Sequence, residues 1–231
     1  SGRAFLASSH VNKMYYNPAV TYTAPIKADG TSYGDASFTA AKVDGYKTTS
    51  TQINLSNGYR AIMSSSDNGS STGAKADFAI SPGNTAGAAF YYTFNTGCSN
   101  GIYSDSCYTQ KSLSTTAEKT NFANWYSYYR TRILAAKAGI SAAFHQQGTA
   151  MRIGYGSINS IGTMVGVSTF SGTSRTAFFN WLFGVKASGG TPLLGALDKA
   201  GNYYKNKDPW RVNPTDSSSA LLECRQNFTI L

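Results

Sequence analysis

The chain has 231 residues, 41% of them hydrophobic, so it can build a core and is not a disordered protein. Only 13% of the residues are charged; the formal net charge is +9, but no run of Lys or Arg is longer than two, which favours a generally cationic surface. No stretch of 18 apolar residues occurs and the first residues lack the pattern of a signal peptide, so we expect no membrane span and a mature or trimmed chain.

Residues 1–113 have the pattern of short strands joined by turns. The dipeptides Asp29–Gly30 and Asp44–Gly45 are typical of turns, and the aromatic-rich run from Ala88 to Phe94 predicts a strand. No helical period occurs in this part of the chain. The 16 tyrosines and the many Ser, Gly and Asn residues are typical of binding loops, and equally of exported bacterial proteins in general.

Two of the three cysteines, Cys98 and Cys107, flank a Gly/Ser/Asn-rich loop. The spacing predicts a disulfide that fixes this loop and therefore an oxidising compartment. A metal site is the alternative, but it needs further Cys or His ligands nearby, and His10 and His145 are each isolated. Cys224 is left over, either as a buried thiol or as half of a bridge to something outside this chain.

A change to helical patterning occurs at Ser114. Thr115 and Glu118 have the spacing of a capping box. Apolar residues then recur every three or four positions, at Phe122, Tyr126, Tyr129, Ile133, Ala136, Ile140 and Phe144. We predict one long helix over about 116–144 that buries Tyr129, Ile133, Ile140 and Phe144 against a sheet. Four large side chains lie off this face: Trp125, Tyr128, Arg130 and Arg132. They form a ligand-binding patch or, as this spacing favours, pack against a neighbouring segment.

The remaining elements predict an α/β fold. Residues 151–158 alternate as a strand does, helices are expected over about 174–186 and from Thr191–Pro192 onward, and 227–231 has the composition of a buried strand. This order predicts a parallel sheet covered by helices, with strands 151–158 and 228–231 in it. Such a sheet needs more than these two strands, and the chain ends within the last of them. We therefore expect a fragment of a larger domain. The predicted organisation is a β-rich insertion over 1–113 and an α/β core over 114–231.

Several motifs resemble known families. Met151–Tyr155, followed by a helix and Ser188-Gly-Gly-Thr-Pro-Leu, resembles the second strand and glycine motif of von Willebrand factor A domains. Five further runs resemble the N-terminal region of PilY/PilC-type proteins of type IV pili: Tyr15–Pro18, Asp29–Gly30, Ala36–Ala41, Phe122–Arg130 and Cys224–Phe228. The resemblance covers most of the chain, from near residue 3 to its end. It implies that the second part is a von Willebrand factor A-like core and that the first part is a β-rich insertion.

The resemblance also implies a metal-ion-dependent adhesion site, in which carboxylates and hydroxyls hold Mg²⁺ or Ca²⁺. Only Thr191 can be assigned to it here, and a simple helix cap is the safer interpretation of this residue. The Asp-x-Ser-x-Ser motif of such sites is absent, because Asp216-Ser-Ser-Ser-Ala220 fails at its last position. We therefore expect no cofactor in this chain, and a divalent cation only in the complete domain.

The function implied by the resemblance is non-enzymatic adhesion and assembly at the tip of an extracellular type IV pilus. The expected partners are minor pilins and a host-cell or surface ligand. An enzyme is disfavoured because neither His has an acidic or nucleophilic neighbour, and no Gly-x-Ser-x-Gly or phosphate-binding loop occurs. The alternative is a nucleic-acid-binding surface module of a DNA-uptake pilus, which the positive charge and the tyrosines favour.

Overall fold

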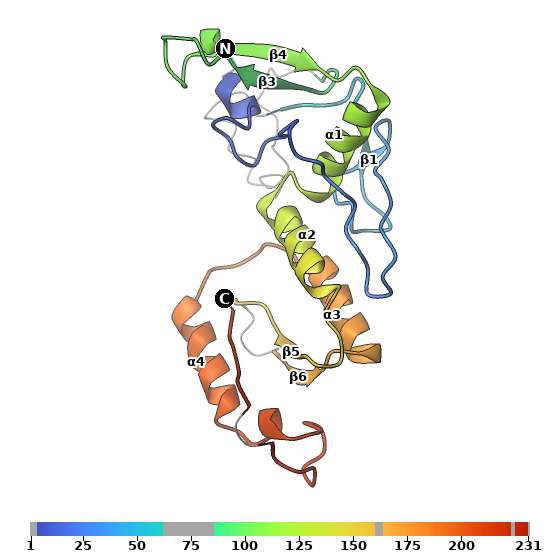
Figure 1. Ribbon diagram of the computed structural model, residues 1–231, viewed down its shortest axis with the longest axis vertical. Coiled ribbons are helices and arrows are strands. Elements are labelled where there is room, and N and C mark those ends of the chain that lie inside the picture. The colour runs from blue at the N-terminus through green and yellow to red at the C-terminus, as the bar shows by residue number, and fades with distance from the viewer. Residues whose placement is uncertain (1–3, 62–85, 160–163, 223–224, 231) are drawn as a thin grey trace. The chain divides into compact units, whose positions relative to one another are not determined.

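The computed structural model describes residues 4–61, 86–159, 164–222 and 225–230 (Figure 1). The chain divides into two compact units, Ser1–Ala142 and Ala143–Leu231. Each unit has a core of its own and is described separately below. None of the helices in the described ranges is long and apolar enough to cross a membrane.

The first unit is built from short strands and two helices. Its elements are η1 (Ala4–Ala7), β1 (Ala41–Lys42), β2 (Gln52–Ile53), β3 (Phe90–Phe94), η3 (Asp105–Cys107), β4 (Tyr108–Ser112), α1 (Thr116–Tyr128) and α2 (Arg132–Phe144), the last of which ends two residues past the unit's boundary. β1 pairs with β2 and β3 with β4, both antiparallel. The strand predicted over 88–94 is therefore confirmed as β3.

Helix α1 begins at the predicted capping box. The Glu118 amide donates to Thr115 Oγ1 at 3.1 Å, and the Thr115 amide donates to Glu118 Oε2 at 2.9 Å. The amide and hydroxyl of Ser114 donate to the same carboxylate oxygen, at 2.9 and 2.8 Å. Amides that have no partner within the helix are thereby satisfied, which confirms where the helical pattern starts.

This cap has a testable pH dependence. Hydrogen bonds from Thr115 and Ser114 lower the pKa of Glu118 from 4.5 to about 2. Because the pKa is lower in the folded chain, the stabilisation is complete above about pH 4.5 and is lost as the pH falls towards 2. We predict that Glu118→Gln lowers the free energy of unfolding by about 0.5–1 kcal/mol at neutral pH. Urea unfolding should show this difference in the free energy of unfolding shrinking as the pH falls from 4.5 towards 2. A difference that stays constant with pH would contradict the assignment.

The core of the first unit is aromatic and lies against α1. Trp125 and Phe122 contribute from the helix, and Tyr15, Tyr16 and Tyr59 contribute from the loops, all at most 4% exposed. The ring centroids of Phe122 and Trp125 are 5.0 Å apart, and Tyr16 lies 4.8 Å from Phe122. The buried hydroxyls are paired, since Tyr15 and Tyr59 share a hydrogen bond of 2.8 Å. These rings hold irregular loops together where a large sheet is lacking.

An irregular segment, residues 14–36, is held by side chains of α1. Asn121 accepts from the Tyr22 amide at 2.7 Å and donates to the Val20 carbonyl at 2.8 Å. One turn later, Asn124 donates to the Tyr22 carbonyl and accepts from the Ala36 amide, both at 2.8 Å. The two amide side chains thus replace the backbone pairing that a neighbouring strand supplies in a sheet.

The prediction of one continuous helix over 116–144 is wrong, because the helix breaks between Tyr128 and Arg132. Arg130 is 1% exposed, and its guanidinium donates to the Val43 carbonyl at 2.7 Å and to the Tyr126 carbonyl at the end of α1. Thr131 then starts α2, since its Oγ1 accepts from the Leu134 amide at 3.3 Å.

The break changes which face of the second helix is buried. Ile140 is exposed and Tyr129, Ile133 and Phe144 are only partly buried, so the predicted buried face is wrong. The buried residues of α2 are instead Leu134, Lys137, Ala138 and Ser141. Of the side chains assigned to packing outside that face, three are buried, namely Trp125, Tyr128 and Arg130, and Arg132 is exposed.

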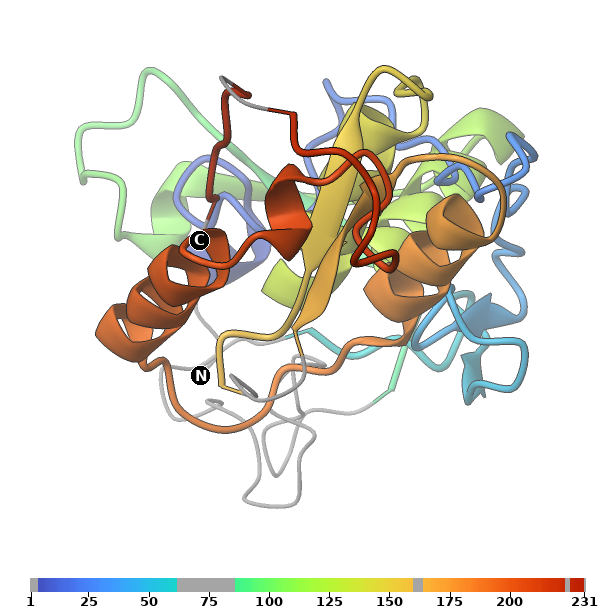
Figure 2. The ribbon, with the colours of Figure 1, turned by 90° about the horizontal axis from the view of Figure 1, so that it is seen from below.

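The second unit is a hairpin flanked by helices. Its elements are β5 (Arg152–Tyr155), β6 (Val165–Thr169), α3 (Gly172–Gly184), α4 (Leu193–Tyr204) and η4 (Asp208–Trp210). Figures 1 and 2 show the hairpin lying between α3 and α4. On the α4 side, the Val167 amide donates to the Tyr203 hydroxyl at 2.8 Å. A Cβ on Gly166 would lie 2.9 Å from that hydroxyl, which explains the glycine there.

The core of the second unit is formed by α3 and the strands beside it. Phe178, Phe179 and Leu182 of α3 are at most 4% exposed, as is Phe170, which follows β6. Phe144 packs 5.2 Å from Phe178. Both predicted helices are present, and Phe183 is a further buried residue of α3.

The predicted parallel, von Willebrand factor A-like sheet is wrong. In the described residues the strands form three separate two-stranded antiparallel sheets. β5 pairs antiparallel with β6, with Arg152 opposite Thr169. Nine residues join them, which is too few for a parallel crossover but enough for a hairpin. Residues 228–230 form no strand, with Phe228 79% and Ile230 86% exposed, and Leu231 lies outside the described residues. The division at residue 113 into an insertion and a core stays a prediction.

Candidate binding loop

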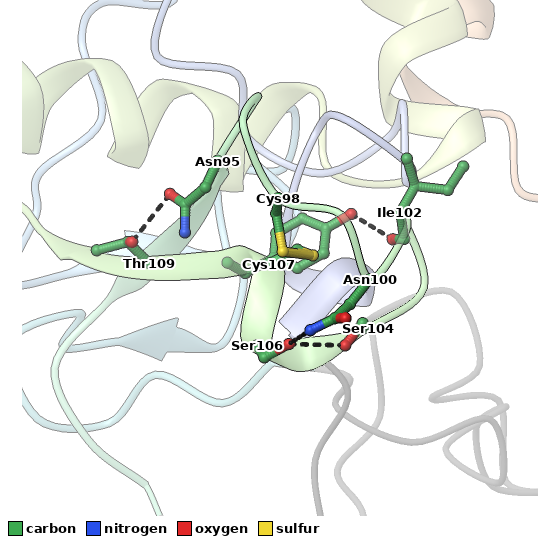
Figure 3. The surroundings of a disulfide bond; sticks show 9 residues. Asn95, Cys98, Asn100, Ile102, Ser104, Ser106, Cys107 and Thr109 are labelled. Atoms are coloured by element: carbon green, nitrogen blue, oxygen red, sulfur yellow. Dashed lines mark hydrogen bonds between the residues drawn. A yellow bond between two sulfur atoms is a disulfide. The ribbon is translucent and has the colours of Figure 1, made fainter.

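The loop between β3 and β4, residues 95–107, is the candidate functional site. Phe94 and Tyr108 are paired across the hairpin at its base, and the Asn95 amide donates to the Cys107 carbonyl at 2.8 Å. Cys98 and Cys107 are bonded to each other, with an S–S distance of 2.02 Å (Figure 3). The predicted disulfide is therefore confirmed, and it closes the loop just beyond the last strand pair.

Side-chain hydrogen bonds fix the loop further. Asn100 Nδ2 donates to Ser106 Oγ at 3.2 Å, and the Ser104 and Ser106 hydroxyls lie 2.9 Å apart (Figure 3). The hydroxyl of Tyr108, which lies on β4, reaches back to the Ile102 carbonyl at 2.6 Å. The Gly/Ser/Asn composition that excluded a helix here thus supplies the loop with internal hydrogen bonds.

The tip of the loop presents apolar side chains on this fixed frame. Gly101 has a φ of 84°, a conformation that favours glycine, and it turns the chain at the tip. Ile102 and Tyr103 follow it, 40% and 67% exposed. The Tyr103 ring meets Phe5 edge-on at 5.5 Å, so that it is held from one side. A rigid aromatic side chain on a preorganised loop loses little entropy when a partner binds.

The N-terminal residues support the same loop. The Ala4 amide donates to Asp105 Oδ1 at 2.7 Å. Ala4 and Phe5 are buried together with Cys107 and Tyr108 in a small cluster. These contacts join residues about a hundred positions apart, so neither Phe5 nor Asp105 could be assigned to the site from the sequence. Tyr103 could have been found, because it is the only aromatic residue between the two cysteines.

The side chains in and around the loop are suited to contact with a partner. The His10 ring stacks on the Phe94 ring with their centroids 4.3 Å apart, so Phe94 covers one face of the imidazole. Among the described residues there is no group of three or more His, Cys, Asp or Glu side chains that could hold a metal ion. The loop offers a phenol, an aliphatic side chain and hydroxyls, which together are typical of binding surfaces.

Thr191 lies in the second unit, and its side chain is exposed. Helix α4 begins at Leu193 with Pro192 as its N-cap and without a side-chain cap, so Thr191 does not cap it. The strands among the described residues pair antiparallel, so the parallel sheet that the resemblance implies is not found there. A role for Thr191 in a metal site remains a prediction.

Asp216 closes its own turn, where Oδ1 accepts from the Ser218 amide at 2.9 Å. Cys224 lies outside the described residues.

The fold and the loop together define a disulfide-bonded, aromatic-rich α/β protein with a preorganised loop. The chain is homologous over its whole length to part of the type IV pilus biogenesis factor PilY1. It is 33% identical to PilY1 of Pseudomonas aeruginosa strain PAK over an alignment of 248 positions, which covers 98% of this chain and 21% of that protein. It is 36% identical to PilY1 of strain UCBPP-PA14 over an alignment of 250 positions, which covers 100% of this chain and 20% of that protein.

The chain therefore spans about a fifth of the length of these relatives. No family model matches the chain. No solved structure matches it.

Proposed function

We propose that this chain is a non-enzymatic adhesion and assembly module of a pilus biogenesis factor, located outside the cell at the tip of a type IV pilus. The observation that carries the proposal is the homology to PilY1 over at least 98% of the chain. A disulfide in the first unit is in keeping with an exported protein. Minor pilins are the proposed partners in assembly.

The loop over residues 95–107 is the proposed contact with a host-cell or surface ligand. Its support is the combination of a closed backbone and two exposed apolar side chains, Ile102 and Tyr103. Apolar and aromatic residues at the centre of a contact supply most of its binding energy, and a loop that is already ordered adds little entropic cost. Adhesion through the tip of this loop requires neither a catalytic residue nor a cofactor.

The proposal predicts a selective loss of attachment. In the full-length protein, expressed in piliated cells that lack their own copy, Ile102→Ser/Tyr103→Ser should reduce attachment per pilus about tenfold. The number of pili recovered by shearing should not change, because assembly uses other surfaces. The matched control is Val20→Ser, which removes an apolar side chain of the same unit that is 41% exposed.

Equal attachment by the Ile102→Ser/Tyr103→Ser variant and the parent would remove the loop from the binding surface. A parallel fall in attachment and pilus number would assign the loop to assembly instead. Attachment that depends on DNA and falls steeply with salt would favour the nucleic-acid alternative.

A further inference from the structure

Arg152, the first residue of β5, has a guanidinium that is only partly used. Its Nη1 donates to the Pro209 carbonyl at 2.9 Å. Its Nε and Nη2 are buried and have no hydrogen-bond partner. Nε–H and one Nη2–H lie on the same edge of the planar group and point the same way, so they form a fork of two parallel donors. This fork is the geometry that binds both oxygens of a carboxylate.

A second arginine contributes to the same place. Nη1 of Arg225 is also buried and without a hydrogen-bond partner. Burial lowers the pKa of Arg152, and the like charge of Arg225 lowers it further. Buried donors are nearly always paired in folded proteins, and unpaired ones mark a missing water, ion or partner. Charged donors are the most costly of all to leave unpaired.

The described carboxylates of the second unit do not serve these arginines. Each has another partner: Asp198 accepts from Asn202, Asp208 lies 3.6 Å from Arg211, and Asp216 accepts from Ser218. Residues 143–231 contain eight Lys and Arg against four Asp and Glu. The second unit therefore has an excess of positive charge, and the unpaired donors of Arg152 and Arg225 belong to it.

We propose that Arg152 and Arg225 form a receptor for a carboxylate, supplied by an Asp or Glu side chain of an acidic protein segment. The Arg152 fork takes both carboxylate oxygens, and Arg225 supplies a third donor. A protein segment is favoured over a free anion by the neighbouring stretch 225–230, which forms neither helix nor strand and exposes Phe228 and Ile230. An apolar segment flanking the acidic residue would cover these side chains, and an inorganic ion would not. The receptor lies in the second unit and does not depend on the role proposed for the loop.

The test follows the Nε–H signal of Arg152 by NMR in the 231-residue chain, at constant ionic strength. The probe is the blocked peptide acetyl-Leu-Asp-Leu-amide, compared with acetyl-Leu-Asn-Leu-amide and with inorganic phosphate. We expect a saturable shift with the Asp peptide and none with the Asn peptide. Arg152→Lys, which keeps the charge and loses the fork, should raise the Kd about tenfold. Arg132→Gln, which removes the charge of an exposed arginine, should leave the Kd within about twofold.

Three results would overturn the proposal. Phosphate that saturates the Arg152 signal at lower concentration than the Asp peptide would identify a free anion as the ligand. An Arg152 signal that none of the probes moves would mean that water satisfies the fork. Equal weakening by Arg132→Gln would reduce the effect to general attraction by a cationic protein. The titration of the parent chain decides the first two of these, even where Arg152→Lys fails to fold.

Discussion

Trp125→Ala is expected to lower the free energy of unfolding of the first unit by about 3–5 kcal/mol. Trp125 is 1% exposed, and its ring lies 5.2 Å from Tyr15 and 5.0 Å from Phe122. Its Nε1 donates to the Met14 carbonyl at 3.1 Å. The substitution therefore opens a large cavity and leaves a carbonyl without its donor, and each effect destabilises the folded chain.

Equilibrium urea unfolding of the parent and the variant measures this effect. Tyr103→Ala is the matched control, because it removes an aromatic ring of the same unit that is 67% exposed. The control should change the free energy of unfolding by no more than about 0.5 kcal/mol. A loss below about 1 kcal/mol for Trp125→Ala would mean that α1 is not the centre of this core.

Removing the disulfide is expected to cost about 2–3 kcal/mol in the first unit. The bond joins residues nine positions apart, so it restricts a short loop of the unfolded chain. Cys98→Ala/Cys107→Ala is the appropriate variant, since Cys107 is fully buried and a serine there would bury a hydroxyl. The loss should be measured by urea unfolding, and the parent treated with dithiothreitol should match the variant.

The same variant separates the bond's effect on the loop from its effect on the core. The hydrogen bonds from Tyr108 and Asn100 remain available without the disulfide, but the loop gains freedom at its base. Amide hydrogen exchange at Ile102 and Tyr103 should therefore rise more than at Phe122. Unchanged stability in both the variant and the reduced parent would show that the disulfide contributes nothing to holding the loop.

Local signals in the sequence were sufficient for several elements. The capping box predicted the start of α1 because Thr115 and Glu118 bond to each other three residues apart. The disulfide was predictable from two cysteines flanking a stretch that can be neither helix nor long strand. The helix period also placed much of α1 and α2 correctly, but it could not reveal the break, which depends on Arg130 reaching the distant carbonyl of Val43.

The sheet could not be predicted because its arrangement depends on contacts between distant segments. An apolar run such as 227–231 has the composition of a buried strand, but nothing local determines what it pairs with. β6 was missed for a related reason, since Val165–Thr169 is short and its residues are only half buried or exposed. Without β6, the sequence of helices and strands resembled a parallel α/β unit.

The candidate sites show the same division. Ile102 and Tyr103 lie between two cysteines, so the loop could be found from the sequence. The contacts that hold the loop come from the start of the chain, about a hundred positions away, where Phe5 meets Tyr103 and the Ala4 amide donates to Asp105. The Arg152 receptor has no sequence signal, because an arginine whose donors are unpaired differs from any other only in its surroundings.

The most direct test of the proposed role is where this segment lies on the cell. Antibody fragments raised against the folded chain should be applied to unfixed piliated cells that express the full-length protein, and viewed by gold-labelled electron microscopy. Cells lacking the gene give the background. The proposed role predicts gold particles at the free ends of the pili. Labelling spread along the filaments, or confined to the cell body with bare pilus ends, would contradict a function at the pilus tip.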